Sequence, residues 1–290
     1  MKKISIVIVT YNSSKDLHGC LTSIVNNNDI GDELEVIVVD NNSTDRIESK
    51  EIANKIIPNV IFIENKTNGG YGSGNNVGIV ASSAPIVLIM NPDVRLFKPI
   101  FKDAILKYDQ ISNLALLGMT QYESLGKKGN SYLPLGHSLG NLLRYLYYKK
   151  KDKYNPKYMF ISGACFFIRK SMFDQIGCFD ENIFLYGEEY DINYRLRGKN
   201  FDIIYDNTLG YIHPTHNRKY SIKLEEISYK SFLYTRQKHA VNIKKELLNN
   251  LLYLYIMCFR AFLKGDNESI KSYKERISFY KKKYNLEKER

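Results

Sequence analysis

The stretch Ile86-Val87-Leu88-Ile89-Met90-Asn91-Pro92-Asp93 decides how we interpret the rest of this chain. Its apolar run is long enough for a buried strand but too short for a buried helix, and proline ends it because proline cannot donate to a strand ladder. The sequence therefore predicts the carboxylate of Asp93 at the carboxyl end of a strand. In open α/β sheets ligands bind outside these ends, which suits a metal-bound or phosphorylated ligand. An Asx-Pro turn that caps the next helix explains the motif equally well.

Two earlier stretches show the same pattern of a buried strand followed by polar residues. Residues 4–9 are apolar except for Ser5, as expected for a strand buried on both faces of a parallel sheet. Residues 34–39, apolar except for Glu35, repeat this run and end at Asp40. Between them, apolar residues recur at helical spacing over 17–24, after Ser13 or Ser14 as a cap. A strand, a helix and a strand in this order predict a right-handed βαβ unit.

Residues 68–78, Asn68-Gly69-Gly70-Tyr71-Gly72-Ser73-Gly74-Asn75-Asn76-Val77-Gly78, form the most glycine-dense part of the chain and follow a predicted strand at 60–63. Glycines let backbone N–H groups approach an anion, and a following helix start adds its dipole, so we favour a phosphate-binding loop. The alternative is a turn and a small-residue helix packed closely on a strand. The order of motifs argues against a nicotinamide or flavin site, because there the glycines precede the acidic residue, whereas here Asp40 comes first.

The α/β alternation continues after Asp93 and then changes. Residues 121–157 show no clear sheet period and are interpreted as an insertion over the acceptor side of the site. The remaining predicted elements are a helix at 99–108, a strand at 114–119, a strand at 159–168, a helix at 171–176, strands at 202–205 and 209–212, and helices after residue 221.

A second acidic cluster begins a predicted helix that ends near Gly198. Its first turn carries Glu188, Glu189 and Asp191. Carboxylates in a first turn are ordinary because they complement the helix dipole. However, the aromatic approach Phe184-Leu185-Tyr186 would raise the pKa of a neighbouring carboxylate, as a general base requires. Residues two apart on a helix point in different directions, so at most one of Glu189 and Asp191 faces a given substrate atom.

Two histidines, His213 and His216, follow the last predicted strand. A lone histidine is usually structural. Two of them at a strand end, in a chain that also offers Asp93 at a strand end, are candidate metal ligands through neutral imidazole. His216 with Asp93 would give an oxygen and nitrogen site for Mn²⁺ or Mg²⁺ bridging a diphosphate.

Composition limits the class of partner. The 42 Lys and Arg against 31 Asp and Glu give a net charge of +11, which favours an anionic partner: a nucleic acid, a membrane surface or a phosphorylated substrate. No nucleic-acid motif is recognisable, so we expect no nucleic-acid partner. The four scattered cysteines lack zinc spacing and are interpreted as reduced thiols in a cytoplasmic protein. The apolar run after Met1-Lys2-Lys3 leads into polar residues and is interpreted as a strand rather than a signal peptide.

Several ordered motifs carry a specific resemblance that covers residues 4 to about 221. The chain resembles the family 2 glycosyltransferases of the GT-A fold, especially the bacterial rhamnosyltransferase-like branch that builds surface polysaccharides. The motifs are Val9-Thr10-Tyr11-Asn12, Val39-Asp40-Asn41-Asn42-Ser43, Asn68-Gly69-Gly70 with Gly74-Asn75, Asn91-Pro92-Asp93, Gly163-Ala164, and Gly177-Cys178-Phe179-Asp180-Glu181 with Glu188-Glu189-x-Asp191. The resemblance implies a Rossmann-like, mostly parallel sheet with flanking helices over residues 1–220, followed by a helical extension at 221–290.

The resemblance also implies a site. Asp93 matches the last residue of an Asp-x-Asp metal motif, Asn91 stands for its first Asp, and His213 or His216 matches a later histidine ligand. Glu189 occupies the place of the catalytic base, usually an aspartate, with Glu188 and Asp191 beside it. The implied donor-binding residues are Thr10, Tyr11, Asn12, Asp40, Asn42, Asn68, Gly69, Gly70, Asn75, Asn91 and Asp93.

The implied reaction is transfer with inversion from a nucleotide-sugar donor, dTDP- or UDP-linked, to a hydroxyl of a glycan or lipid-linked saccharide acceptor. The alternative is a non-catalytic scaffold of the same fold. The basic, amphipathic extension at 222–290 would contact an anionic membrane surface, in which case the protein is peripheral at the inner face of the cell membrane. A helical cap or a homodimer seam explains the extension equally well.

Overall fold

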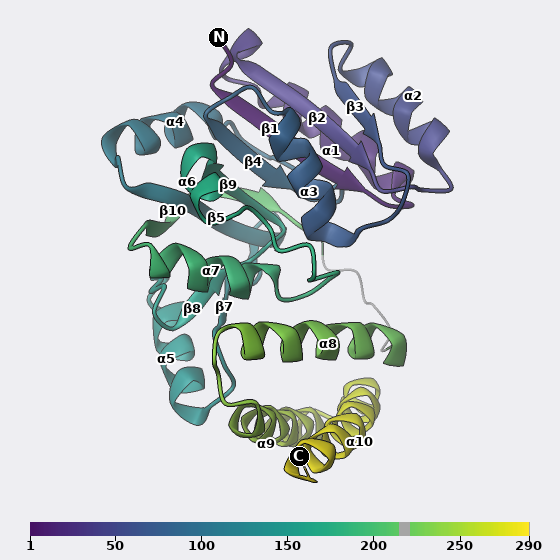
Figure 1. The fold of residues 1–290 in the computed structure, drawn as a ribbon, viewed down its shortest axis with the longest axis vertical. Helices are drawn as coiled ribbons and strands as arrows, with labels where there is room; N and C mark the ends of the chain where they lie inside the picture. Colours follow the sequence, from purple (N-terminus) through teal and green to yellow (C-terminus); the bar gives the residue numbers. More distant parts are fainter. Residues whose placement is uncertain (215–220, 290) are drawn as a thin grey trace. The chain divides into compact units, whose positions relative to one another are not determined.

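The computed structural model describes residues 1–214 and 221–289. The chain divides into two compact units (Figure 1). Unit 1 comprises Met1–Leu133 and Ile161–His216, and unit 2 comprises Pro134–Phe160 and Asn217–Arg290. Each unit is built from its own elements and is described separately below.

Unit 1 is organised around a mixed, mostly parallel sheet in the order β10-β5-β9-β4-β1-β2-β3, with the short strand β6 paired to β5. The pairs β1–β2, β2–β3 and β1–β4 are parallel. Strand β9 runs antiparallel to both of its neighbours, β4 and β5. The strands are β1 (Ile4–Thr10), β2 (Leu34–Asp40), β3 (Ile61–Glu64), β4 (Ile86–Met90), β5 (Leu114–Ser124), β6 (Lys127–Lys128), β9 (Cys165–Arg169) and β10 (Asp202–Ile212). A separate two-stranded sheet pairs β7 (Tyr132–Pro134) with β8 (Met159–Ile161).

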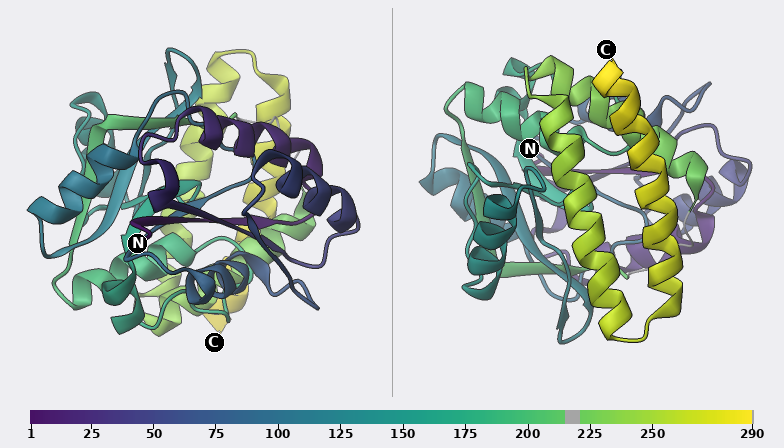
Figure 2. Two further views of the ribbon diagram at one scale, coloured as in Figure 1. Left: turned by 90° about the horizontal axis from the view of Figure 1, so that it is seen from above. Right: turned by 90° about the horizontal axis from the view of Figure 1, so that it is seen from below.

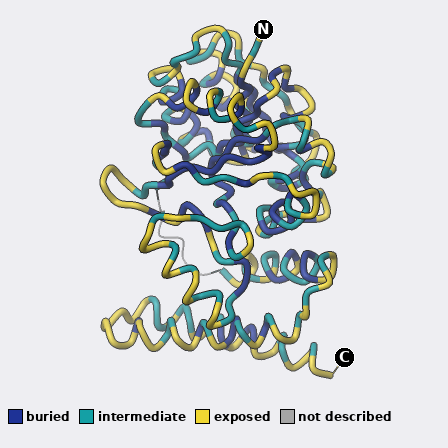
Figure 3. The backbone as a smooth tube through the Cα atoms, turned by 90° about the vertical axis from the view of Figure 1, so that its left-hand side faces the viewer, coloured by how far each residue is buried: buried dark blue, intermediate teal, exposed yellow. Residues whose placement is uncertain are grey.

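Helices cover both faces of this sheet, because alternate residues of a strand point to opposite faces. On β1, Ile4, Ile6 and Ile8 belong to the main core together with Leu17 of the following helix. The glycine-rich helix covers the other face, where Gly78 lies against Val7. The buried strands stand out in Figure 3. The helices of unit 1 are α1 (Ser14–Asn26), α2 (Arg46–Ile56), α3 (Gly70–Ala81), α4 (Phe101–Gln110), α6 (Lys170–Gln175) and α7 (Glu188–Gly198), with a 3₁₀ turn at Gly31–Glu33.

The predicted α/β class and its C-terminal helices are confirmed, but two predicted strands differ. The single strand predicted at 159–168 is two strands, β8 and β9, in different sheets. Ser162 donates its backbone N–H to Ser131 and Asn91 donates to Ala164, so the chain turns between the two sheets. The two strands predicted at 202–205 and 209–212 are one strand, β10, with a bulge between Asp206 and Gly210.

Unit 2 is helical. It contains α5 (Leu139–Lys150), α8 (Ile222–Lys238), α9 (Ile243–Leu263) and α10 (Asn267–Glu289). Helices α9 and α10 lie side by side, as the right-hand view of Figure 2 shows. The hydrophobic core of unit 2 includes Tyr229, Leu247, Leu254, Ile277 and Phe279. Within the described part of the chain, none of the helices has both the length and the apolar character needed to cross a membrane.

Candidate active site

The loops that follow β1 and β2 are tied together at the carboxyl edge of the sheet. The backbone N–H of Asn41 donates to the carbonyl of Thr10 (2.9 Å), and the N–H of Asn12 donates to Ser43 Oγ (3.0 Å). Asn12 Oδ1 in turn accepts the N–H of Thr44 at 2.8 Å. Asn12 adopts a left-handed backbone with φ of 52°, which asparagine tolerates better than most residues. These bonds fix the shape of the loops in which Thr10, Tyr11, Asn12 and Asn42 were predicted to hold a nucleoside.

Asp40, at the end of β2, is fully buried but only half satisfied. Its Oδ1 accepts the backbone N–H of Ser43 at 2.9 Å, whereas its Oδ2 has no hydrogen-bond partner among the described residues. A buried carboxylate oxygen without a donor is costly, so such an atom indicates a position for a ligand's N–H or O–H group. Tyr11 lies on the adjoining loop and is 53% exposed. The predicted donor-binding role of Asp40 therefore has a free acceptor to support it.

The predicted glycine-rich loop is mostly helix. Only Asn68 and Gly69 precede α3, and Asn68 Oδ1 accepts the N–H of Gly70 at 3.0 Å. A Cβ at position 74 would lie 2.7 Å from Val9 Cγ1, so glycine there permits close packing of α3 on β1. The buried Asn75 donates to the carbonyl of Tyr71 within the same helix. Close packing accounts for Gly74 and Asn75, whereas phosphate binding by residues 68–78 stays a prediction.

Asn41 links three of the predicted motifs, although it was not among the predicted site residues. Its side-chain amide donates to the carbonyl of Gly70 at 2.8 Å, and its Oδ1 accepts from Asn65 at 2.8 Å. The loop after β2 is thus held against the start of α3 and the end of β3. Its neighbours in the motif, Asp40 and Asn42, suggested ligand contacts, but the amide of Asn41 is used inside the protein.

The carboxyl end of β4 meets the end of β10. Arg95 and Ile212 exchange both backbone hydrogen bonds at 2.8 Å, which places the residue after β10 beside the residues that follow β4. As a result His213 Nε2 lies 3.2 Å from Asp93 Oδ1. The structure thereby brings together Asp93 and one of the two predicted histidines. His216 lies outside the described residues.

Asp93 and His213 fit a divalent cation as a partial ligand set. A carboxylate and an imidazole are suitable donors for Mn²⁺, and a cation that bridges a diphosphate takes further ligands from the phosphates and from water. No cluster of three or more His, Cys, Asp and Glu with metal-binding geometry occurs within residues 1–214 and 221–289.

A sharp turn positions the start of α7 against the start of α3. Tyr186 and Gly187 both have positive φ, 67° and 125°. The chain just before them contacts Gly70, where a side chain would overlap the carbonyl of Phe184, and Tyr71 donates its N–H to the same carbonyl at 3.0 Å. The aromatic approach and the glycine-rich stretch, predicted as separate motifs, are therefore two sides of one contact.

Glu189 is half-buried against the turn at Gly163. A Cβ at position 163 would lie 2.7 Å from Glu189 Cδ, so only glycine leaves room for this carboxylate. Burial raises the pKa of Glu189, while the backbone N–H groups of Gly163 and Gly187 oppose the rise. Tyr71 donates its hydroxyl to the carbonyl of Gly163 at 2.6 Å. The carboxylate is thus held by a glycine that Tyr71 fixes in place.

The same turn reaches the strand-end motif. Ala164, next to Gly163, accepts the backbone N–H of Asn91 at 2.9 Å. Asn91, two residues before Asp93, and Glu189 therefore contact the same two-residue segment. The two acidic motifs, almost a hundred residues apart in sequence, belong to one site in unit 1.

The other two carboxylates of this turn have different surroundings. Asp191 is fully buried and paired with Arg195, whose Nε and Nη2 lie 2.8 Å and 2.6 Å from Oδ2. Arg195 also donates to the carbonyl of Cys178 at 2.6 Å, so the pair anchors the loop before α7. Glu188 is buried, and burial together with the charge of Glu189 raises its pKa to about 8. Its Oε1 has no hydrogen-bond partner in the part of the chain that the structure describes.

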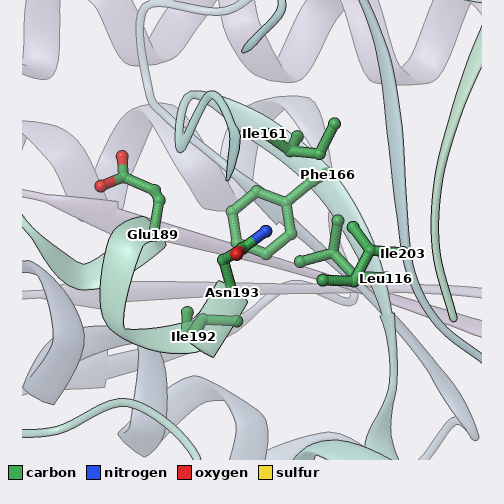
Figure 4. A pocket seen from close by; sticks show the side chains of 7 residues that line it. All are labelled: Leu116, Ile161, Phe166, Glu189, Ile192, Asn193 and Ile203. Carbon is green, nitrogen blue, oxygen red and sulfur yellow. The ribbon is translucent and has the colours of Figure 1, made fainter. Parts of the chain in front are cut away.

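A cavity of about 10 Å³ lies behind Glu189 (Figure 4). Such a volume holds about one water molecule, so it is no substrate site. The carboxylate of Glu189 points away from the ring of Phe166 in this view. The cavity is lined by Leu116, Ile161, Phe166, Glu189, Ile192, Asn193 and Ile203.

The model of the family described as "Glycosyl transferase family 2" matches residues 5–177, which is more than half of the chain. The chain belongs to glycosyl transferase family 2. The matched range includes the loops after β1, β2 and β4 and the turn at Gly163, whereas the helix start at Glu188 lies beyond it.

Two proteins of known name are similar over most of the chain. The low-salt glycan biosynthesis hexosyltransferase Agl10 of Haloferax volcanii is 27% identical over 81% of this chain and 74% of its own length. The N-acetylglucosaminyl-diphospho-decaprenol L-rhamnosyltransferase of Mycobacterium tuberculosis is 28% identical over 66% of this chain and 69% of its own.

A solved structure agrees in fold. The mannosyltransferase PcManGT from Pyrobaculum calidifontis, in complex with GDP-Man and Mn²⁺, has a TM-score of 0.60 and 15% identity over 98% of this chain and 85% of that one. The chain spans a smaller share of two other similar proteins. It covers 32% of the poly(ribitol-phosphate) beta-N-acetylglucosaminyltransferase TarP of Staphylococcus aureus and 43% of the solved chain of S. aureus TarS.

Proposed function

We propose that this glycosyltransferase moves a sugar from a nucleoside-diphosphate-sugar, dTDP-rhamnose or a UDP-hexose, to a hydroxyl of a glycan or lipid-linked acceptor, with inversion at the anomeric carbon. The observation that carries the proposal is the half-buried carboxylate of Glu189, held against the turn that also contacts the strand-end motif of Asn91. The relative from M. tuberculosis, an L-rhamnosyltransferase named for a diphospho-decaprenol acceptor, supports this choice of substrates.

The donor would bind along the carboxyl edge of the sheet. Asp40 offers a buried carboxylate oxygen to the N–H or O–H groups of a base or ribose, and the exposed ring of Tyr11 lies on the adjoining loop. Asp93 and His213 would hold the metal ion. When bound, Mn²⁺ or Mg²⁺ would neutralise the charge that builds up on the departing nucleoside diphosphate.

Glu189 would act as the general base. An acceptor hydroxyl that donates to its carboxylate loses its proton to Glu189 as the oxygen attacks the anomeric carbon from the face opposite the diphosphate. The raised pKa of Glu189 makes the carboxylate a better proton acceptor than an exposed glutamate. Gly163 and Tyr71 keep it in place.

The geometry favours Glu189 over Asp191 as the base. Asp191 is fully buried and paired with Arg195, so its carboxylate is already used by the protein. Glu188, whose pKa is raised to about 8, would stay protonated at neutral pH and would leave the negative charge of the pair on Glu189.

Calorimetric titration of the full chain with a panel of nucleotide-sugars tests the proposal, with Mn²⁺ present or chelated. The panel contains dTDP-rhamnose, UDP-glucose, UDP-N-acetylglucosamine and GDP-mannose. We expect one dTDP- or UDP-linked donor to bind and to be consumed when a saccharide acceptor is added, with inverted anomeric configuration in the product by NMR. A non-catalytic scaffold would consume none of them, and retention of configuration would exclude direct displacement.

A further inference from the structure

The net positive charge of this protein comes from unit 2. By sequence, unit 2 carries 24 Lys and Arg against nine Asp and Glu, whereas unit 1 carries 18 against 22. The net charges are therefore +15 and −4. A charge of +15 on such a small unit attracts anionic surfaces over several ångströms at physiological ionic strength.

Helix α9 of unit 2 leaves a long apolar stripe exposed. The stripe repeats at intervals of three, four and one residues, so its members share one face of the helix. Phe259, Phe262 and Leu263 are 61%, 67% and 68% exposed. The stripe consists of Leu248, Leu252, Tyr255, Ile256, Phe259, Phe262 and Leu263.

The other side of α9 is already used for folding. Leu247, Leu251 and Leu254 are buried in the core that α9 shares with Ile277 and Phe279 of α10. The stripe is therefore a second apolar surface that the folding of unit 2 does not consume. It spans sixteen residues, or about 24 Å along the helix axis. An exposed apolar surface of this length marks an interaction site.

Exposed cations surround the stripe. Lys244 and Lys245 precede it on the same helix and Lys264 follows it, all three exposed. From α10, Lys281 Nζ lies 5.5 Å from the centre of the exposed Tyr255 ring. Apolar residues between lysines at both ends are typical of a helix that lies in the plane of a bilayer with anionic headgroups.

We propose that the α9 stripe docks on an anionic phospholipid surface, with its apolar side chains among the acyl chains and Lys244, Lys245, Lys264 and Lys281 at the headgroups. A second copy of the chain is a poorer occupant. In a two-fold dimer the stripe of one copy would contact the stripe of the other. The lysines around the two stripes would then face each other, and their like charges would repel.

Co-sedimentation of the full chain with vesicles tests this surface. One set contains phosphatidylcholine alone and the other contains phosphatidylcholine with phosphatidylglycerol. We expect binding to the anionic vesicles that weakens as salt is added, and at least about tenfold weaker binding by F259S/F262S. K244E/K245E should also weaken binding and flatten its salt dependence. I47S is the matched control, since Ile47 is 71% exposed on α2 of unit 1, and it should bind as the native chain does.

Two outcomes overturn the proposal. Equal vesicle binding by the native chain and F259S/F262S, both folded by circular dichroism, would show that the stripe does not contact lipid. If the native chain sediments as a dimer in lipid-free analytical ultracentrifugation and F259S/F262S sediments as a monomer, the stripe is a subunit interface instead.

Discussion

Two acidic regions of unit 1 flank the turn at Gly163 and Ala164, and their carboxylates are held in opposite ways. At the strand ends, Asp40 and Asp93 sit among polar partners, and Asp40 still has a carboxylate oxygen to offer. At the start of α7, burial dominates and raises the pKa of both Glu188 and Glu189. The first arrangement suits carboxylates that bind as anions, and the second suits a carboxylate that takes up a proton.

The three carboxylates of α7 repeat this lesson within a single helical turn. Asp191 is paired with Arg195, burial raises the pKa of Glu188, and Glu189 reaches the glycine turn. Residue type alone does not separate them. Their roles follow from what each side chain contacts. Four substitutions test whether these roles differ as described.

The largest effect is expected from Glu189→Gln. Glutamine keeps the size of the side chain but cannot accept a proton, so the rate of transfer at saturating donor should fall about 10³-fold. Because the ionised carboxylate is half-buried, the variant should be no less stable than the native chain. Steady-state transfer assays and thermal unfolding measure the two effects. Native-like transfer would move the base to another residue.

Gly163→Ala should reduce kcat about 10²-fold, because the new methyl group displaces the Glu189 carboxylate by roughly 1 Å or more. Donor affinity should change little. Gly198→Ala is the control. Gly198 lies on α7, as Glu189 does, and a Cβ there would meet no atom of the described residues within 4 Å apart from its own neighbours along the helix. Full kcat in Gly163→Ala would show that the contact between Gly163 and Glu189 has no catalytic consequence.

Asp191→Asn should act on stability. Removing the charge leaves the partly buried Arg195 without its ionic partner, which costs about 3 kcal/mol of unfolding free energy. Urea denaturation measures this loss, and transfer per folded molecule should fall far less than in Glu189→Gln. If Asp191→Asn is stable and inactive, Asp191 is the base and the contrast between these two carboxylates is wrong.

A pH dependence of stability is expected from Glu188. Its pKa is raised from 4.5 to about 8, so the folded state binds a proton that the unfolded state releases. This stabilisation is fully present below pH 4.5 and is lost as the pH rises to about 8. Relative to Glu188→Gln, the native unfolding free energy should fall by about 1.4 kcal/mol per pH unit in that window. Parallel stability curves for the two proteins would contradict the raised pKa.

Much of the fold could be predicted because its strands are buried on both faces. Residues 4–9, 34–39 and 86–90 are apolar runs with abrupt polar ends, and each is a strand of the parallel sheet. The prediction was wrong where long-range pairing decides. Residues 159–168 are mostly apolar, but β8 pairs with β7 and β9 pairs with β4 and β5. Composition does not reveal which partner a strand takes.

The candidate site was predictable as a set of polar residues at strand ends and at one helix start. The contacts that give these residues different roles could not be predicted, since they join residues far apart in sequence. Gly163 makes room for Glu189, and Tyr71 anchors Gly163. The glycines of α3 gave an ambiguous signal, because close packing on β1 and binding of a phosphate both require small residues.

The central claim is that the strand-end carboxylates hold the donor while Glu189 activates the acceptor. The affinity of UDP or dTDP in the presence of Mn²⁺, measured by calorimetry for the native chain, Glu189→Gln and Asp93→Ala, tests this division directly. We predict that Glu189→Gln binds the nucleotide within about threefold of the native chain, whereas Asp93→Ala binds at least about tenfold more weakly. Weak binding by Glu189→Gln with native-like binding by Asp93→Ala would contradict it.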